Sequence, residues 1–284
     1  MPMDARKMNP DYKVGPARPE CSKSPKGLQA ETQLLGPADP QPFEVENADS
    51  TSPLLLVCEH AGRVIPQALG NLGLSARAYD EHIAWDIGAA EVSRGIAKRV
   101  GAPLVLQPYC RLVIDCNRPP DEPDAITAVS DRHPVPGNVQ LSDGDRANRA
   151  REIFWPFQRQ IDSMFARSPR SLAVSIHSFT PVMDGVARPW DIGLLHRKDS
   201  ETAPCLKDLL AHRRPDLNIA FNEPYGIDNA TDWFVPRHAE ARGIRHVMIE
   251  IRNDLIATAA AADNWAQFLS DCVTDLLTKE PQCL

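Results

Sequence analysis

The sequence places side chains able to hold a metal ion and to move a proton at the ends of short apolar runs. They are two imidazoles, several carboxylates and an arginine: Glu59 and His60 in VCEH, residues 115–118 (DCNR), His177 in SIHS and Glu250 in IEIRND. Ligand sites of open α/β sheets lie outside the carboxyl ends of the strands, so these side chains are expected at one sheet edge. Two histidines, a carboxylate and an open position for water are what a hydrolytic zinc site needs. Each residue alone is more often structural, but together they predict such a site.

The segment 80–86 (DEHIAWD) adds two possible ligands to this edge. If a helix begins at Asp80, His82 and Asp86 are four residues apart and lie on the same face of its first turns. Both side chains would then point at a metal. The alternative is that Asp80 or Asp86 only caps the helix and stabilises its positive end by about 1 kcal/mol.

The elements that would position these residues alternate along the chain. Apolar runs with Val and Ile predict strands over 53–59, 103–108, 111–117, 172–179, 191–197 and 246–252. Apolar residues at three- and four-residue spacing predict helices over 85–100, 147–164 and 265–276. Ser142, followed by Asp143 and Asp145, predicts the start of the second helix. This order predicts an α/β fold of three layers, a mostly parallel or mixed sheet with helices on both faces.

A single catalytic domain is expected over residues 51–284. Residues 1–50 are rich in Pro, Lys, Ser and Gln without an apolar period, which predicts a disordered extension that adds nothing to the core. The proline-rich stretch 118–141 predicts a long functional loop. The seven cysteines are odd in number and show no CxxC spacing, so they predict buried packing residues rather than disulfides or a thiolate zinc site.

Composition narrows the class of partner. With 31 Lys and Arg against 38 Asp and Glu, the net charge is −7, and no broad basic face for nucleic acid is expected. No run approaches the roughly 18 apolar residues of a membrane span, and the N-terminus lacks the apolar core of a signal peptide. The sequence therefore predicts a cytoplasmic protein that acts on a small molecule, and it leaves the oligomeric state open.

At these residues the sequence resembles the N-formylglutamate amidohydrolase family. The similar segments are, in order, VCEHAGRVIP, DEHIAWDIGA, RLVIDCNRP, SIHSFTP and MIEIRNDL, and the similarity runs from about residue 53 to 278. This family looks like a distant relative of the zinc carboxypeptidases, which implies a zinc-carboxypeptidase-like fold. The resemblance implies a hydrolase that cleaves the N-formyl, or another N-acyl, amide of a small carboxylate-bearing substrate such as N-formylglutamate.

The resemblance also implies the metal ligands. His177 matches a zinc-binding histidine, and His60 fits the first one. The carboxypeptidase pattern has a glutamate three residues after that first histidine, whereas Arg63 and Val64 stand there in this chain. The candidates for the third ligand are Asp86, which we favour, Glu59 and His82. Adjacent side chains of an extended strand point in opposite directions, so Glu59 is expected instead to orient an imidazole.

The remaining roles concern proton transfer and substrate binding. One zinc ion per chain, or another divalent metal, would lower the pKa of its bound water to roughly 7. Glu250 matches the glutamate that activates this water, and it would pass the proton to the leaving amine. Asn117 and Arg118 match the pair that grips the substrate carboxylate, and Arg111 either adds charge there or lies exposed on the surface. Three residues are weaker candidates: Tyr225 would reach over a substrate from a loop, and His238 would line the pocket. Arg252 would either bind a second substrate carboxylate or only pair with Asp254.

Two other functions use the same residues. A zinc amidase or carboxypeptidase-like enzyme would act on another acyl amino acid or on a short peptide. A non-catalytic binding module would keep the fold without the chemistry, but the presence of His60, His177 and Glu250 argues against it.

Overall fold

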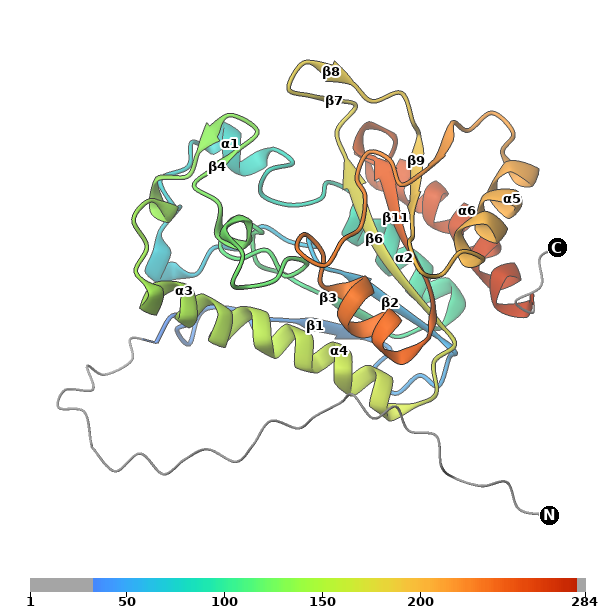
Figure 1. Cartoon of the computed structure of the whole chain (residues 1–284), viewed down its shortest axis with the longest axis horizontal. Helices are drawn as coiled ribbons and strands as arrows, with labels where there is room; N and C mark the ends of the chain where they lie inside the picture. Colours follow the sequence, from blue (N-terminus) through green and yellow to red (C-terminus); the bar gives the residue numbers. More distant parts are fainter. Residues whose placement is uncertain (1–32, 280–284) are drawn as a thin grey trace, which may run out of the picture. The chain divides into compact units, whose positions relative to one another are not determined.

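A seven-stranded mixed sheet forms the centre of the computed structural model, which describes residues 33–279 (Figure 1). Its strands lie in the order β1-β3-β2-β6-β11-β9-β10. Four neighbours run parallel: β3 (Leu104–Leu106), β2 (Leu54–Cys58), β6 (Leu172–Phe179) and β11 (Arg245–Arg252). The strands β9 (Ile192–Leu195) and β10 (Ile219–Phe221) pair in parallel, β9 runs antiparallel to β11, and β1 (Glu44–Glu46) runs antiparallel to β3.

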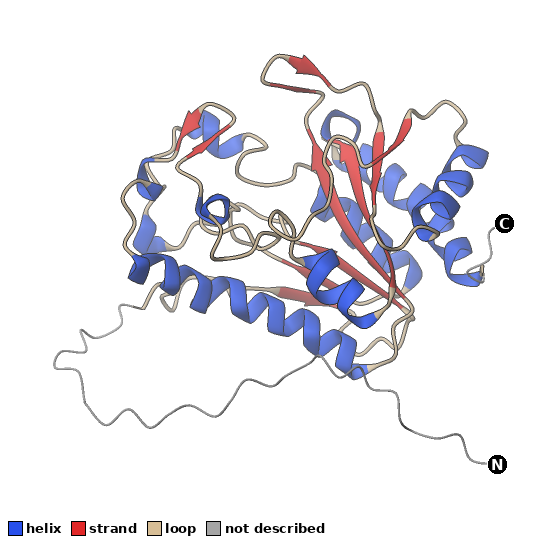
Figure 2. Cartoon of the chain, in the orientation of Figure 1, coloured by secondary structure: helices blue, strands red, loops and turns tan. Residues whose placement is uncertain are grey.

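Helices cover both faces of the sheet (Figure 2), because strand residues alternate between two apolar clusters. In β2, Leu54, Leu56 and Cys58 join one cluster, and Leu55 and Val57 join the other. The first face is covered by α2 (Ala89–Val100), α5 (Thr202–Arg213) and α6 (Ala259–Thr278). The second is covered by α3 (Asp143–Arg149), a π-helical segment (Ala150–Phe154) and α4 (Trp155–Arg167). The predicted three-layer α/β fold is confirmed.

Short elements lie in the connections, including the predicted loop 118–141. They are α1 (Ala76–Asp80), the hairpins β4 (Val129–Ser130) with β5 (His133–Pro134) and β7 (Val182–Met183) with β8 (Val186–Ala187), the π-helical segment Phe234–Ala239, and 3-10 turns at Gln67–Leu69, Pro123–Ile126, Pro136–Asn138, Glu240–Arg242 and Asn253–Leu255. The predicted helix start at Ser142 is confirmed, because its hydroxyl accepts the N–H of Asp145 while the Asp145 carboxylate accepts the N–H of Ser142.

The strand predicted over 111–117 is wrong. This apolar run is buried, but it forms turns rather than a sheet strand. The N–H of Val113 donates to Cys110 O (2.9 Å), and the N–H of Asn117 donates to Asp115 Oδ1 (2.9 Å), an Asx turn that keeps the chain from extending. A buried apolar run that forms turns has the same composition as a buried strand, so composition cannot distinguish the two.

The helix predicted to begin at Asp80 is also wrong, because α1 ends there. Glu81 is extended (φ −87, ψ 167), and the next helix begins only at Ala89. Between them the N–H of Asp86 donates to the backbone oxygen of His60 (3.0 Å), so the chain crosses the end of β2. This backbone contact, and not a shared helix face, brings Asp86 to the sheet edge.

The predicted domain boundary near residue 50 is wrong for residues 33–50. Within them β1 extends the sheet, and the buried Leu34 joins the second cluster. The Tyr109 hydroxyl donates to Pro40 O (2.6 Å), and Glu152 accepts the N–H of Leu35 (2.8 Å). Residues 33–50 have a low apolar content because they add only a short edge strand to a core that other segments form. Their sequence therefore gave no sign that they belong to the domain. Residues 1–32, predicted as part of the same extension, lie outside the described residues.

A chain that begins at Asp49 is therefore expected to be less stable than one that begins at Gln33. Removing residues 33–48 exposes the edge of β3 and empties the place of Leu34, and burying one such side chain stabilises a fold by about 1.5–3 kcal/mol. We expect the melting temperature to fall by about 5 °C or more. Equal melting temperatures of the two chains in calorimetry would show that this segment docks without stabilising the domain.

Two further predictions bear on the chain as a whole. Cys58, Cys110, Cys116, Cys205 and Cys272 are buried and unbridged, as expected for packing residues, while Cys21 and Cys283 lie outside the described residues. None of the helices within residues 33–279 is long and apolar enough to cross a membrane.

Candidate metal centre and active site

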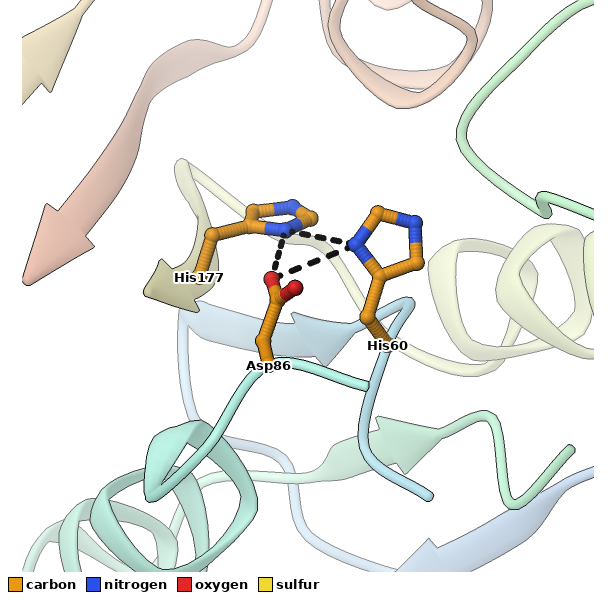
Figure 3. A group of neighbouring side chains, drawn as sticks. All are labelled: His60, Asp86 and His177. Atoms are coloured by element: carbon orange, nitrogen blue, oxygen red, sulfur yellow. Dashed lines mark hydrogen bonds and ion pairs between the residues drawn. The ribbon is translucent and has the colours of Figure 1, made fainter. Parts of the chain in front are cut away.

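Three side chains from separate parts of the sequence meet at the carboxyl edge of the central strands (Figure 3). His60 follows β2, His177 lies in β6, and Asp86 precedes α2. Asp86 Oδ2 lies 2.8 Å from His177 Nδ1 and 3.2 Å from His60 Nδ1, and the two Nδ1 atoms are 3.2 Å apart. All three side chains are buried. Within residues 33–279 this is the one group of three or more such side chains whose ligand atoms converge.

The donor atoms fit a divalent metal ion. Ligands bound at about 2.0–2.1 Å around a tetrahedral zinc ion lie about 3.3 Å from one another, close to the separations seen here. Each imidazole turns its other nitrogen to a carboxylate: His60 Nε2 lies 2.7 Å from Asp115 Oδ1, and His177 Nε2 lies 3.1 Å from Glu59 Oε2. If those nitrogens carry the protons, both Nδ1 lone pairs and the Asp86 oxygen face one point, and a cation there satisfies all three.

The carboxylates around the imidazoles are held in their charged form. Burial would raise the pKa of Asp115, but the Arg111 guanidinium and His60 hold it well below its usual range. Burial would likewise raise the pKa of Asp86, but His60, His177 and Arg111 together lower it. Arg111 Nη2 donates to Asp115 Oδ2 (2.6 Å), and Arg111 Nη1 donates to Asp86 Oδ1 (3.2 Å). Asp86 is thus an ionised side chain, as a metal ligand must be.

Glu250 lies beside the cluster because β11 pairs in parallel with β6, which sets Glu250 opposite His177. The side chain is only 5% exposed, and its Oε2 has no hydrogen-bond partner. Burial raises the pKa of Glu250 to about 7. Glu250 lines the same cavity as the metal-binding cluster, and its buried carboxylate oxygen without a partner is available to accept a proton from a bound water or substrate.

A cavity of about 610 Å³ opens above these residues. Its wall includes His60, Asp86, His177 and Glu250, together with residues of both short hairpins and of the loop around Tyr225. Gly193, opposite Glu250 on β9, allows this loop to cross the strand, because a Cβ there would lie 1.8 Å from Glu223 O. Tyr225 lines the cavity from this loop, and its contact with a substrate stays a prediction.

The predicted carboxylate-binding residues line the same cavity, but they are engaged to different degrees. Arg111 is occupied by Asp86 and Asp115, so the alternative of an exposed, free Arg111 is wrong. Arg118 is 30% exposed on its side chain and has only long contacts, 3.5 Å to Asp115 Oδ2 and 4.0 Å to Asp124 Oδ2. Of these two arginines, Arg118 therefore has the guanidinium that is more open to a substrate carboxylate.

Asn117 anchors a loop as well as lining the cavity. Its Oδ1 accepts the N–H of Phe234 (3.0 Å), and its Nδ2 donates to Asp232 Oδ1 (3.4 Å). Its backbone oxygen also accepts the N–H of Trp233 (2.8 Å). The side chain thus joins the 111–118 turns to the start of the π-helical segment, and one N–H of its Nδ2 is left for a ligand.

The two alternative third ligands lie outside the converging group. His82 lines the cavity, but its Nε2 lies 3.3 Å from Asp131 Oδ2 on the β4–β5 hairpin. Glu59 lies at the far nitrogen of His177 and accepts the Ser175 hydroxyl (2.7 Å). It therefore contacts an imidazole from behind, which is where the alternation of strand side chains placed it.

Two of the weaker candidates are structural. His238 contacts Asp162 (3.0 Å) and Gln158 (2.8 Å) and does not line the cavity. Arg252 pairs with Asp254 (2.8 Å) and Asp191 (3.2 Å), also outside the cavity wall. The expectation that His238 lines the pocket is wrong, and of the two alternatives for Arg252 the structure shows the pair with Asp254.

Two residues of the site, Asp115 and Asp232, had no individual role predicted from the sequence. Asp115 orients His60 and Arg111, and its position two residues before Asn117 is the spacing of an Asx turn, which could have drawn attention to it. Asp232 is buried in the cavity wall against Asn117, and burial raises its pKa. Its local contacts with Asp228 and Thr231 give no sign of the site, because the contact that joins it to the site is with Asn117, 115 residues away along the chain.

Two solved structures are similar to this chain. The gene product Atu2144 from Agrobacterium tumefaciens is 38% identical to this chain, with a TM-score of 0.82 and coverage of 86% of this chain and 98% of that one. N-formylglutamate amidohydrolase from Ralstonia eutropha JMP134 shares the fold at 17% identity, with a TM-score of 0.57 and coverage of 84% and 97%. None of the curated proteins matches the sequence.

The model of one protein family, N-formylglutamate amidohydrolase, matches residues 52–257, which include His60, Asp86, His177 and Glu250. The match covers well over half of the sequence. This chain therefore belongs to the N-formylglutamate amidohydrolase family and is a hydrolase that acts on a non-peptide amide bond.

Proposed function

We propose that this chain is a zinc-dependent amidohydrolase that removes the N-formyl, or another N-acyl, group from a small substrate bearing a carboxylate, such as N-formylglutamate. The observation that carries the proposal is one cavity that combines a convergent buried His60–Asp86–His177 group with the unpartnered carboxylate of Glu250. Arg118, in the same wall, offers a guanidinium to the substrate carboxylate.

The residues divide the chemistry among themselves. A zinc ion held by His60, Asp86 and His177 would supply Lewis acidity, polarising the acyl oxygen and lowering the pKa of water. Glu250 takes the proton of the attacking water on its free Oε2 and gives it to the departing amine nitrogen. Asp115 keeps His60 in one orientation, and Arg118 fixes the substrate so that its acyl carbon faces Glu250.

Replacing Arg118 with alanine is expected to raise KM for carboxylate substrates by about 10-fold or more, because a charge-assisted hydrogen bond is lost. A substrate analogue whose carboxylate is replaced by a neutral amide serves as the internal control, since it should discriminate poorly between the two proteins. Steady-state kinetics with both substrates measure the effect. An unchanged KM for the carboxylate substrate removes Arg118 from substrate binding.

A screen of N-formyl, N-acetyl and N-succinyl amino acids for released amine tests the proposed activity. Assays run after chelation and after re-addition of zinc, with other divalent ions in parallel, test the metal. We expect amine release that chelation abolishes and zinc restores. Turnover that persists in the fully chelated protein would contradict zinc dependence.

The same screen, extended to short peptides, distinguishes the other candidate functions. Turnover of short peptides, or of acyl amino acids other than the N-formyl ones, would favour a broader zinc amidase. Binding of carboxylate compounds without turnover of any of them would favour a non-catalytic binding module.

A further inference from the structure

Arg188 is an arginine without a carboxylate partner at the rim of the cavity. It follows β8 and closes the β7–β8 hairpin, its N–H donating to Pro181 O (2.8 Å). Its guanidinium donates to the Tyr225 hydroxyl (3.0 Å) and to Met183 Sδ (2.8 Å), and it lies 5.0 Å from the Tyr225 ring centroid. Within the described part of the chain, no carboxylate forms an ion pair with it.

Both partners of Arg188 belong to the cavity wall. The Tyr225 ring and hydroxyl orient the guanidinium, which leaves further N–H groups unused, because arginine carries five and these contacts use two. An arginine oriented by an aromatic ring but not neutralised by an acid can receive an anion at little ordering cost.

The charges of the cavity explain why such a group matters. Among the described residues, its wall carries six carboxylates (Asp86, Asp115, Asp124, Asp131, Asp232 and Glu250) but two arginines, Arg111 and Arg118. Arg111 is already occupied by Asp86 and Asp115. A substrate with one carboxylate can use Arg118, but a second carboxylate meets an excess of acidic groups unless another cation receives it.

We infer that Arg188 is a specificity-determining residue that receives the second carboxylate of a dicarboxylic N-acyl amino acid, while Arg118 receives the first. Arg118 lines the cavity from the 111–118 turns, whereas Arg188 follows the β7–β8 hairpin and reaches the cavity through its contacts with the lining residues Met183 and Tyr225. The inference rests on the proposed function and adds to it the residue that distinguishes dicarboxylic from monocarboxylic substrates. Arg188 also takes the place of Arg252, the candidate for a second carboxylate in the sequence. Arg252 is already paired with Asp191 and Asp254.

The test compares N-formyl-L-glutamate with N-formyl-L-glutamine, which has nearly the same shape but a neutral side chain. In the zinc-supplied full chain, Arg188→Gln is expected to lower the ratio of the two kcat/KM values, glutamate over glutamine, by about 10-fold or more, mainly through KM for the formylglutamate. Arg188→Lys keeps the charge and should retain part of the preference. Arg132→Gln is the matched control, because it removes another rim arginine that is paired with Asp184 (2.9 Å).

Binding of the products L-glutamate and L-glutamine, measured by titration calorimetry, gives a second readout that does not depend on turnover. We expect wild type to bind glutamate more tightly, and Arg188→Gln to lose most of that difference. The inference is overturned if wild type shows no preference for the dicarboxylate, or if Arg188→Gln and Arg132→Gln shift the preference equally. If the chain hydrolyses other N-acyl amino acids without a preference for the dicarboxylate, only this inference is contradicted. If it hydrolyses no N-acyl compound, the proposed function is contradicted as well.

Discussion

Replacing Glu250 with glutamine is expected to lower kcat by about 100-fold or more while KM changes little. Glutamine keeps the shape of the side chain on β11, but it cannot accept the proton of the attacking water. A general base acts in the transition state rather than in substrate capture, so the loss should appear in kcat. Steady-state kinetics on the first active substrate from the acyl amino acid screen measure this effect.

Two controls make this result specific. Asp131→Asn makes the same kind of change in a cavity-lining carboxylate outside the metal-binding group, and we expect its kcat to stay within about 3-fold of wild type. Metal analysis of Glu250→Gln should give the same zinc content as wild type. If kcat of Glu250→Gln is unchanged at full zinc content, Glu250 takes no part in the chemistry.

Replacing His177 with alanine is expected to abolish stoichiometric zinc binding. His177 Nδ1 is the atom closest to Asp86 Oδ2 in the converging group, so its loss leaves two ligands and an opened site. Loss of a residue that only orients a ligand typically costs about 10–100-fold in metal affinity, and loss of a ligand should exceed the upper end of that range. Metal analysis after dialysis, with a competing chelator to measure affinity, detects the change.

His82→Ala is the matched control for this experiment. His82 lines the same cavity and was a sequence-based candidate ligand, but it faces Asp131 instead of the converging group. We expect this variant to keep one zinc ion per chain. Tightly held, stoichiometric zinc in His177→Ala would overturn the ligand assignment, and loss of zinc in His82→Ala would restore His82 as a ligand.

Much of the fold follows from the sequence because its central strands are buried on both faces. Runs such as 53–59 and 172–179 are apolar throughout, and β6 occupies all of the predicted 172–179. Parallel strands bring their carboxyl ends to one edge, so the polar residues that end β2, β6 and β11 could be expected to meet. His60, His177 and Glu250 were selected from sequence on this ground, and the structure brings them together.

Contacts between distant segments account for what the sequence could not predict. The residues of 111–117 are as apolar as a strand, but only their contacts show that they turn inside the core. Asp86, Glu59 and His82 were all possible third ligands, and the hydrogen bond from Asp86 N–H to His60 O brings Asp86 into the group. Contacts between distant segments also decide which arginines are free to bind a substrate.

The sequence does not show whether an arginine is paired with a carboxylate or free. Its partners come from distant parts of the chain, so they are known only from the folded structure. Local patterns placed Arg118 at the end of an apolar run near the site, and they left open whether Arg111 lies there or on the surface. Packing then engages Arg111 with Asp86 and Asp115, leaves Arg118 open, and sets Arg188 beside Tyr225, which lies 37 residues away along the chain. Local sequence patterns thus specify most of the strands and helices, and they indicate that the site lies at the carboxyl ends of the strands. The pairing of charged side chains across the cavity is decided only when distant segments pack together.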